Sequence, residues 1–363
     1  MKGNLMNKYA LAVSCSNEYA PYLSVWLQSV IEHYKKDELL HIFVFENEIN
    51  DEYKEKLFSQ IVGFNVELNF TDPSRLLGNN LYIANQYFKK ECYFRIAAPV
   101  MLNTFNKILF TDVDLIFEDD FSNIFDFDLG ENVLAAIKDP IMAAHVNSHL
   151  FGSNEYIENT LKMTDPYKYM NTGVLLFNVK QYLNNKCFQY ILDLCMKNKY
   201  VLQEQDAISS AYSEKATFLP IKYNFTPYTS VWRSYNVLQY MPQRIKDEYL
   251  NCYKSAIVIH WACGPTKPWF HPEEDLAYLW WKYARKTPFY EEILARLTAF
   301  QIQEQSDSIT DLIRRVLHYR RDKMKYWRYK ILSKITFGKR RKRYKQKRRA
   351  LKAQLRQIRQ LMK

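Results

Sequence analysis

The 363-residue sequence is poor in glycine, in paired cysteines and in long apolar runs. Only 8 residues are glycine, and this composition excludes a collagen-like chain. The six cysteines lie far apart without a C-x-x-C pair, which fits reduced thiols in a cytosol better than a disulfide framework or a zinc site. No apolar stretch reaches about 18 residues, so we expect no membrane-spanning helix. The apolar run at 9–13 is also too short for a signal peptide.

The charge that the sequence does carry is divided along the chain. Hydrophobic residues make up 48% and charged residues 25%, which is typical of a globular protein and excludes disorder over most of the length. The net charge is +12, yet residues 314–363 hold 22 Lys and Arg against one acid, Asp322. Because the whole chain has 51 basic and 39 acidic residues, the first 313 residues have a net charge of −9. The sequence therefore predicts a mildly acidic body and a strongly basic C-terminal region.

Strand and helix patterns alternate through the body. Short apolar or alternating runs predict strands, and apolar residues three and four apart predict helices. The predicted strands are 8–14, 41–46, 65–70, 107–111, 133–138, 173–179 and 256–260. The predicted helices are 20–34, 51–61, 86–102, 185–199 and 203–213. Over residues 8–70 the order is β-α-β-α-β, which favours an α/β fold with a parallel sheet and right-handed crossovers.

Beyond the last predicted strand the pattern changes. From about residue 276 the chain becomes helical and then basic, and a polar stretch at 300–310 predicts a linker. We expect a catalytic domain at 1–280 and a helical, basic region at 281–363.

Two carboxylates follow the predicted strand at 107–111. Asp112 and Asp114 are two residues apart, so in an extended segment both side chains point to one side and can face one cation. Mg²⁺ and Mn²⁺ prefer oxygen ligands and accept diphosphate oxygens as well. A D-x-D also occurs by chance in solvated loops. Its position at a strand end, where ligands collect in α/β sheets, favours the metal site.

A histidine ends the strand at 256–260. A single histidine is more often structural than a ligand, but His260 is followed by Gly264 and Lys267. Glycine allows close approach of the backbone, and a lysine is a point charge suited to phosphate. We interpret the segment as a third metal ligand followed by a diphosphate-binding turn. The alternative is a turn that packs Trp269.

Five segments in this order resemble glycosyltransferase family 8, whose members include bacterial lipopolysaccharide galactosyl- and glucosyltransferases. They are SNEYAPYL (16–23), YFRIAAP (93–99), ILFTDVDLIF (108–117), MNTGVLLFNV (170–179) with QEQDAI (203–208), and IHWACGPTKPW (259–269). The resemblance implies a GT-A fold, in which helices flank a Rossmann-like mixed sheet. It also implies a nucleotide-sugar donor (usually a UDP-hexose), a divalent metal (usually Mn²⁺), and retention of anomeric configuration.

The resemblance also assigns roles to single residues. It implies Asp112, Asp114 and His260 as metal ligands. Gln205 and Asp206 match residues beside the reacting carbon, as nucleophile or stabiliser. The implied donor-binding residues are Ser14, Ser16, Glu18, Tyr19, Arg95, Val113, Asp139, Asn171, Thr172, Glu204, Gly264 and Lys267. Glu204 stands where the family commonly has the shorter Asp, which could shift selectivity for the hexose.

The C-terminal region combines basic clusters with aromatic residues. Such a combination favours an anionic membrane surface, although a solvated basic helix or a nucleic-acid-binding arm would look similar. We consider nucleic acid the less favoured partner. The candidate membrane-binding residues are Trp327, Arg340, Arg341, Lys342, Arg343, Lys345, Lys347, Arg348 and Arg349.

The predicted function is that of a retaining hexosyltransferase. We expect it to move galactose or glucose from UDP-galactose or UDP-glucose to a lipopolysaccharide or lipooligosaccharide acceptor, with Mn²⁺ or alternatively Mg²⁺. We expect a cytoplasmic protein that binds peripherally to the inner face of the cytoplasmic membrane. One alternative is a glucosyltransferase acting on protein or a glycogen-like glycan. The other is a non-catalytic protein that binds nucleic acid or a surface through the basic region.

Overall fold

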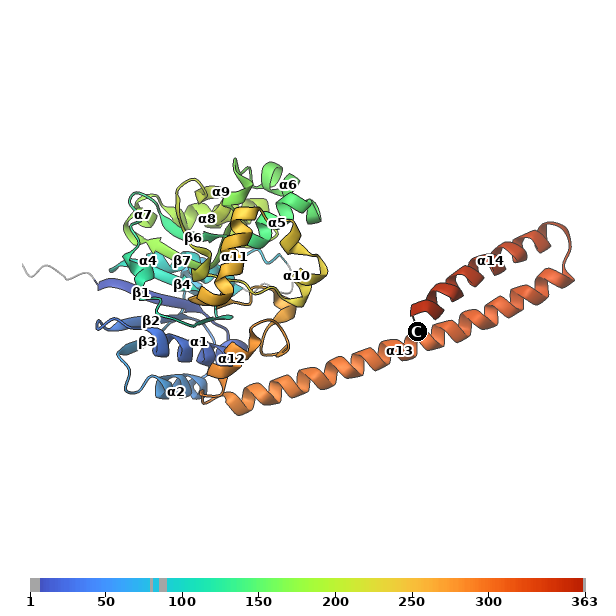
Figure 1. Ribbon diagram of the computed structural model, residues 1–363, viewed down its shortest axis with the longest axis horizontal. Helices are drawn as coiled ribbons and strands as arrows, with labels where there is room; N and C mark the ends of the chain where they lie inside the picture. Colours follow the sequence, from blue (N-terminus) through green and yellow to red (C-terminus); the bar gives the residue numbers. More distant parts are fainter. Residues whose placement is uncertain (1–6, 79–80, 85–89, 362–363) are drawn as a thin grey trace, which may run out of the picture. The chain divides into compact units, whose positions relative to one another are not determined.

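The structure is a computed structural model that describes residues 7–78, 81–84 and 90–361. The chain divides into two compact units, Met1–Leu294 and Ala295–Lys363. The first unit is a layered α/β structure, and the second consists of helix (Figure 1).

Within the described residues, seven strands form one mixed sheet in the order β3-β2-β1-β4-β7-β6-β8. All neighbours in this sheet are parallel except at β7, which runs antiparallel to β4 and β6. A small second sheet pairs β5 antiparallel with β9. The strands are β1 Asn7–Ser14, β2 Leu40–Phe45, β3 Val66–Thr71, β4 Phe105–Thr111, β5 Leu115–Phe117, β6 Leu134–Lys138, β7 Met170–Asn178, β8 Ala216–Leu219 and β9 Val258–His260.

Helices cover both faces of the large sheet. On one face, Ala10 and Ala12 of β1 lie in a core with Phe94 and Ala97 of α4, together with residues of α7, α8 and α9. On the other face, α1 presents Trp26, whose Nε1 donates to Thr111 Oγ1 of β4 at 3.0 Å. The helices of the first unit are α1 Ala20–His33, α2 Asp51–Gln60, α3 Ser74–Leu77, α4 Phe94–Met101, α5 Pro140–Ser148, α6 Ser153–Glu155, α7 Val179–Asn184, α8 Cys187–Asn198, α9 Gln203–Tyr212, α10 Ser230–Ser234, α11 Gln243–Ser255 and α12 Ala277–Ala284.

The seven predicted strands are confirmed, with shifts at their ends. The parallel pairing that the alternation predicts is confirmed for β1, β2 and β3. The mixed sheet that the resemblance implies is confirmed at β7, which runs antiparallel to both neighbours. The short strands β5 and β8 were not predicted. The helix predicted at 86–102 is a 3₁₀ turn at Lys90–Tyr93 followed by α4, and residues 86–89 lie outside the described residues.

The linker predicted at 300–310 is also wrong. Helix α13 runs without interruption from Tyr290 to Ile335. Residues 301–310 are exposed, and they include Gln and Glu, which are good helix formers, without any Gly or Pro. The polar composition of this stretch therefore reflects an exposed helix, and the boundary between the two units lies slightly earlier, between Leu294 and Ala295.

The second unit contains a helical hairpin. Helix α14 spans Gly338–Leu361, and its first residue, Gly338, adopts a φ of +60° after the two residues that separate it from α13. Across the turn, the rings of Tyr329 and Tyr344 stack with centroids 5.9 Å apart, and Lys347 Nζ lies 5.5 Å from the centre of the Tyr329 ring. These contacts pack the end of α13 against the start of α14. In the part of the chain that the structure describes, no helix combines the length and apolar character needed to cross a bilayer.

Candidate active site

Strand pairing brings the two predicted carboxylates and the histidine together. Directly after β4, the backbone N–H of Asp112 donates to the Gly173 carbonyl of β7 at 2.9 Å. The chain then enters β5, whose first residue Leu115 pairs with His260 of β9. Asp114 lies between these two anchored points. The junction of β4 and β5 therefore carries both carboxylates, and β9 delivers the imidazole beside them.

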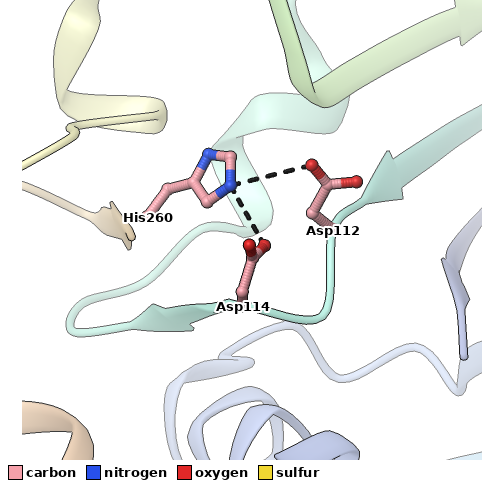
Figure 2. A group of neighbouring side chains, drawn as sticks. All are labelled: Asp112, Asp114 and His260. Atoms are coloured by element: carbon pink, nitrogen blue, oxygen red, sulfur yellow. Dashed lines mark ion pairs between the residues drawn. The ribbon is translucent and has the colours of Figure 1, made fainter. Parts of the chain in front are cut away.

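The three side chains converge, as Figure 2 shows. The Nε2 atom of His260 is 3.0 Å from Asp114 Oδ1 and 3.7 Å from Asp112 Oδ2. One ligand atom from each residue lies within 4.8 Å of the others. His260 is buried, whereas both carboxylates remain partly exposed. We call Asp112, Asp114 and His260 the metal triad, because this arrangement can hold a metal ion.

The polar atoms of the metal triad fit a cation. Oδ1 of Asp114 is buried and accepts no hydrogen bond. A buried carboxylate oxygen without a hydrogen-bond donor is costly unless a cation faces it. Burial alone raises the pKa of Asp114, but the ammonium group of Lys267 holds it well below its usual range. Asp114 is therefore ionised and able to bind a cation.

Lys267 brings a positive charge to the same carboxylate. Its ammonium group pairs with Asp114 Oδ2 and donates to the Trp261 carbonyl at 2.6 Å. The turn before it begins at Gly264, which is exposed. The lysine that was predicted to meet diphosphate therefore lies at the metal triad.

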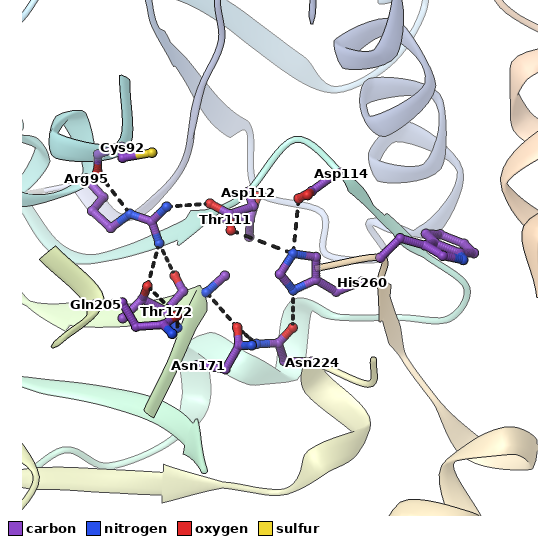
Figure 3. Close-up of polar contacts among 12 residues, drawn as sticks. Cys92, Arg95, Thr111, Asp112, Asp114, Asn171, Thr172, Gln205, Asn224 and His260 are labelled. Carbon is purple, nitrogen blue, oxygen red and sulfur yellow. Dashed lines mark hydrogen bonds and ion pairs between the residues drawn. The ribbon is translucent and has the colours of Figure 1, made fainter. Parts of the chain in front are cut away.

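Arg95 reaches the site from α4 and is buried (Figure 3). Its Nη2 donates to Asp112 Oδ1 at 2.6 Å, and its Nη1 donates to the Thr172 carbonyl at 2.5 Å and to Thr172 Oγ1 at 2.9 Å. Burial alone lowers the pKa of Arg95, but Asp112 and Glu204 raise it above its usual value. The guanidinium therefore stays charged and orients Asp112.

Glu204 shares this arginine. Its Oε1 lies 3.3 Å from Arg95 Nε, and its Oε2 is buried without a hydrogen-bond partner. Burial raises the pKa of Glu204 to about 7, although Arg95 opposes the shift. Glu204 therefore exchanges a proton near neutral pH, unlike the ionised Asp114.

The two residues predicted to be catalytic differ in their surroundings. Gln205 is partly exposed, and its Oε1 accepts from the backbone N–H and the hydroxyl of Thr172 at 3.0 and 3.1 Å. Asp206 is fully buried and accepts from Tyr169 Oη at 2.5 Å, from Tyr156 Oη at 2.7 Å and from the Leu202 N–H at 2.7 Å. Three protein donors therefore hold the Asp206 carboxylate at the start of α9, and its catalytic role stays a prediction.

Asp139 and Asn171 are also held by protein contacts. Asp139 caps α5 through Oδ1, which accepts the N–H groups of Ile141 and Met142 at 2.8 and 2.9 Å. Its Oδ2 accepts from Asn171 Nδ2 at 3.2 Å. This pair fixes the loop after β6 against the start of β7.

The predicted first loop of the donor site follows β1. Ser14 ends that strand, Ser16 is buried with a hydroxyl that has no hydrogen-bond partner, and Glu18 is exposed. The ring of Tyr19 meets Trp269 edge-on at 5.8 Å. Between the carboxylates of the triad, Val113 is partly exposed.

Sequence reasoning missed two residues that touch His260. Asn224 is buried, and its Oδ1 lies 2.9 Å from His260 Nδ1. A Cβ atom built on Gly173 would lie 2.2 Å from His260 Cε1 and 2.6 Å from Nδ1, so only glycine fits beside the ring. No motif marked Asn224, whereas Gly173 lies in the quoted N-T-G segment and was overlooked as a packing position.

Comparison with known proteins decides the family. The profile of glycosyl transferase family 8 matches residues 10–272. The chain belongs to glycosyltransferase family 8. It is therefore a glycosyltransferase, and enzymes of this family use a nucleotide sugar and a divalent metal.

Solved structures of other glycosyltransferases share the GT-A fold of this family 8 enzyme. The WbbM bifunctional glycosyltransferase matches with a TM-score of 0.73 and 24% identity, over 82% of this chain and 53% of the WbbM chain. The galactosyltransferase LgtC, solved with donor and acceptor sugar analogues, matches with a TM-score of 0.62 and 22% identity, over 77% of this chain and 96% of LgtC.

A curated relative has a named activity. The lipopolysaccharide 1,2-glucosyltransferase of Escherichia coli (strain K12) is 26% identical over 197 residues. The match covers 51% of this chain and 50% of that enzyme, so it spans about half of either protein.

Proposed function

We propose that this family 8 enzyme is a retaining hexosyltransferase that moves galactose or glucose from a UDP-hexose to a lipopolysaccharide or lipooligosaccharide acceptor. The observation that carries the proposal is the convergence of Asp112, Asp114 and His260 at the carboxyl end of β4. The relative that is named a lipopolysaccharide 1,2-glucosyltransferase supports this acceptor class. LgtC, a galactosyltransferase, supports a hexose donor.

In this proposal the metal triad holds Mn²⁺, with Mg²⁺ as the alternative. Bound there, the metal would supply positive charge that stabilises the departing diphosphate. Lys267 adds a second positive charge at the same place, and its contact with Asp114 keeps the ammonium at the triad before donor binds. Arg95 holds Asp112 in orientation through a 2.6 Å contact. Oriented charges of this kind need little rearrangement during the reaction.

The donor would lie across the carboxyl ends of β1 and β4. Ser14, Ser16, Glu18 and Tyr19 of the first loop are proposed to contact the uridine, and Gly264 the diphosphate. Gln205 is the proposed residue beside the reacting carbon, because it is partly exposed while Asp206 is enclosed. Glu204 and Thr172 lie next to Gln205 and are proposed to contact the hexose.

A panel of UDP-sugars with linkage analysis of the product tests the donor and the acceptor together. We expect metal-dependent release of UDP from UDP-galactose or UDP-glucose, and transfer to a lipooligosaccharide acceptor with retained configuration. If the sugar is transferred only to protein or to a glycogen-like glycan, the proposed lipopolysaccharide acceptor is wrong and one of these is the acceptor. Absence of turnover with every UDP-sugar would contradict the proposal.

We further propose that the second unit binds an anionic membrane, which would hold the enzyme at the inner face of the cytoplasmic membrane. Met324, Trp327, Ile331 and Ile335 recur at helical spacing on α13 and remain exposed. Positive charge surrounds this apolar stripe, and the combination suits an anionic lipid surface better than nucleic acid. The predicted basic residues of α14 are exposed, with Arg348 partly so: Arg340, Arg341, Lys342, Arg343, Lys345, Lys347, Arg348 and Arg349.

A further inference from the structure

A series of hydrogen bonds runs from the backbone of Gly173 through two asparagine side chains to His260 of the metal triad. The backbone N–H of Gly173 donates to Asn171 Oδ1 at 3.0 Å. A backbone amide can only donate, so this contact fixes which end of the Asn171 side chain is the oxygen. The same oxygen lies 2.9 Å from Asn224 Nδ2. If the Asn224 amide were reversed, two oxygens would face each other at that distance, so its orientation is fixed as well (Figure 3).

The fixed Asn224 amide determines where His260 carries its proton. Asn224 presents Oδ1 to His260 Nδ1 at 2.9 Å, and an amide oxygen can only accept. Nδ1 must therefore hold the hydrogen. With Nδ1 committed to this hydrogen bond, Nε2, the nitrogen that faces Asp114 and Asp112, is the one that can offer a lone pair to a metal when the ring is neutral.

Burial protects this arrangement from competition. Asn224 is 1% exposed and His260 is 3% exposed, so bulk water does not offer Nδ1 another acceptor. Gly173 packs against the same ring and leaves no room for a Cβ atom. The ring is therefore confined by packing on one side and oriented by one acceptor at Nδ1.

We propose that Asn224 is a positioning residue that holds His260 in the tautomer with Nε2 free to bind the metal. The inference rests on the proposed metal triad and adds a residue that binds neither metal nor substrate. Removal of such an outer partner typically weakens metal binding about 10- to 100-fold. Without the Asn224 oxygen, the proton would move to Nε2 and donate to Asp114 Oδ1, and a metal would then have to displace it.

Two substitutions of similar size separate the acceptor from mere packing. Asn224→Leu keeps the bulk and removes the acceptor, whereas Asn224→Asp keeps the bulk and an oxygen for Nδ1 but loses the donor to Asn171. Binding of Mn²⁺ alone, measured from the electron paramagnetic resonance signal of free Mn²⁺, should be at least about tenfold weaker in Asn224→Leu and clearly less weakened in Asn224→Asp. Equal affinity of Asn224→Leu and the unchanged protein would overturn the inference, as would an equal loss in both variants.

Asn178→Ala serves as the matched control. It removes the cap of α7 and so lowers stability, but it lies outside the metal triad and should leave Mn²⁺ affinity unchanged. Nitrogen-15 NMR of the His260 ring in metal-free protein reads the tautomer directly, about two pH units above the ordinary imidazole pKa. We expect Nδ1–H in the unchanged protein and Nε2–H in Asn224→Leu, and Nε2–H in both would refute the role of Asn224. If the tautomers are as expected but no Mn²⁺ binds, the proposed metal triad fails and not the assignment of Asn224.

Discussion

Gln205 and Asp206 are adjacent residues with opposite environments. Successive residues on a helix point about 100° apart, so on α9 one side chain faces the site while the next faces the core. Three hydrogen bonds hold the Asp206 carboxylate, and two of them come from tyrosine hydroxyls. Gln205 instead binds the Thr172 turn and keeps partial exposure. One of the pair therefore supports stability and the other is available for chemistry.

Substitution to alanine should separate these two roles. We expect Asp206→Ala to lower the free energy of unfolding by about 3 kcal/mol or more. The substitution removes the carboxylate that accepts three hydrogen bonds and leaves those buried donors without an acceptor. Gln205→Ala should cost less than about 1 kcal/mol and should lower kcat instead. Urea unfolding and donor-dependent nucleotide release measure the two quantities. The assignment is wrong if Asp206→Ala is stable and inactive while Gln205→Ala remains active.

Glu204 should make stability depend on pH. Its pKa is about 7 in the folded protein against an ordinary value of 4.5, so on raising the pH the unfolded chain ionises first. Protonated Glu204 therefore contributes roughly 3 kcal/mol to the free energy of unfolding. This contribution is fully present below about pH 4.5 and is lost as the pH rises through about 7. Glu204→Gln should remove this loss in metal-free protein. Urea unfolding across this range tests it, with the exposed Glu158→Gln as a control that should follow the unchanged protein.

At the scale of elements, strands were easier to predict than their pairing. The apolar runs at β1, β4 and β9 could be located from the sequence, and with them the metal triad at the ends of β4 and β9. The direction of β7 and the short strands β5 and β8 could not be predicted, because pairing depends on distant segments. Asn224 was missed for the same reason: its partners Asn171 and His260 are far away in sequence.

Strand β7 positions His260 through a glycine. Gly173→Ala would place a Cβ atom 2.2 Å from the imidazole. The backbone at Gly173 cannot easily move away from the ring, because Gly173 makes backbone hydrogen bonds with both Asp112 and Asn171. We therefore expect His260 to move, with about 1–3 kcal/mol of lost stability and a clear loss of Mn²⁺ affinity.

Gly130→Ala is the matched control for this substitution. Gly130 has a φ of +50° and open space around its Cβ position, so the change strains the backbone without touching the site. It should lower stability and leave Mn²⁺ affinity intact. Unchanged Mn²⁺ affinity in Gly173→Ala would show that β7 does not hold the imidazole in place.

For the whole molecule, the net charge of +12 combines two regions of opposite sign. The match to family 8 ends at residue 272, well before the basic residues begin at 314. The basic region forms helices that the family match does not cover. The positive charge of this region is therefore not part of the active-site chemistry, and it affects which surfaces the enzyme can bind.

Replacement of Arg340, Arg341, Lys342 and Arg343 by Gln should weaken membrane binding. Each basic residue near an anionic surface contributes about 1 kcal/mol, so partitioning should fall by roughly a thousandfold. Co-sedimentation with phosphatidylserine-containing vesicles measures it, and neutral phosphatidylcholine vesicles should pellet neither protein. The matched control replaces four exposed lysines of the first unit, Lys180, Lys197, Lys215 and Lys254, with the same change in net charge. Equal loss in both variants would mean that total charge, not this helix, governs binding.

The most direct test of the account is the metal dependence of donor turnover in the unchanged enzyme and in His260→Ala. We expect nucleotide release from a UDP-hexose to require Mn²⁺, to stop when EDTA is added, and to fall steeply at limiting Mn²⁺ in His260→Ala. A His260→Ala enzyme with full activity at limiting Mn²⁺, or turnover that persists in EDTA, would contradict the central claim that Asp112, Asp114 and His260 hold the metal.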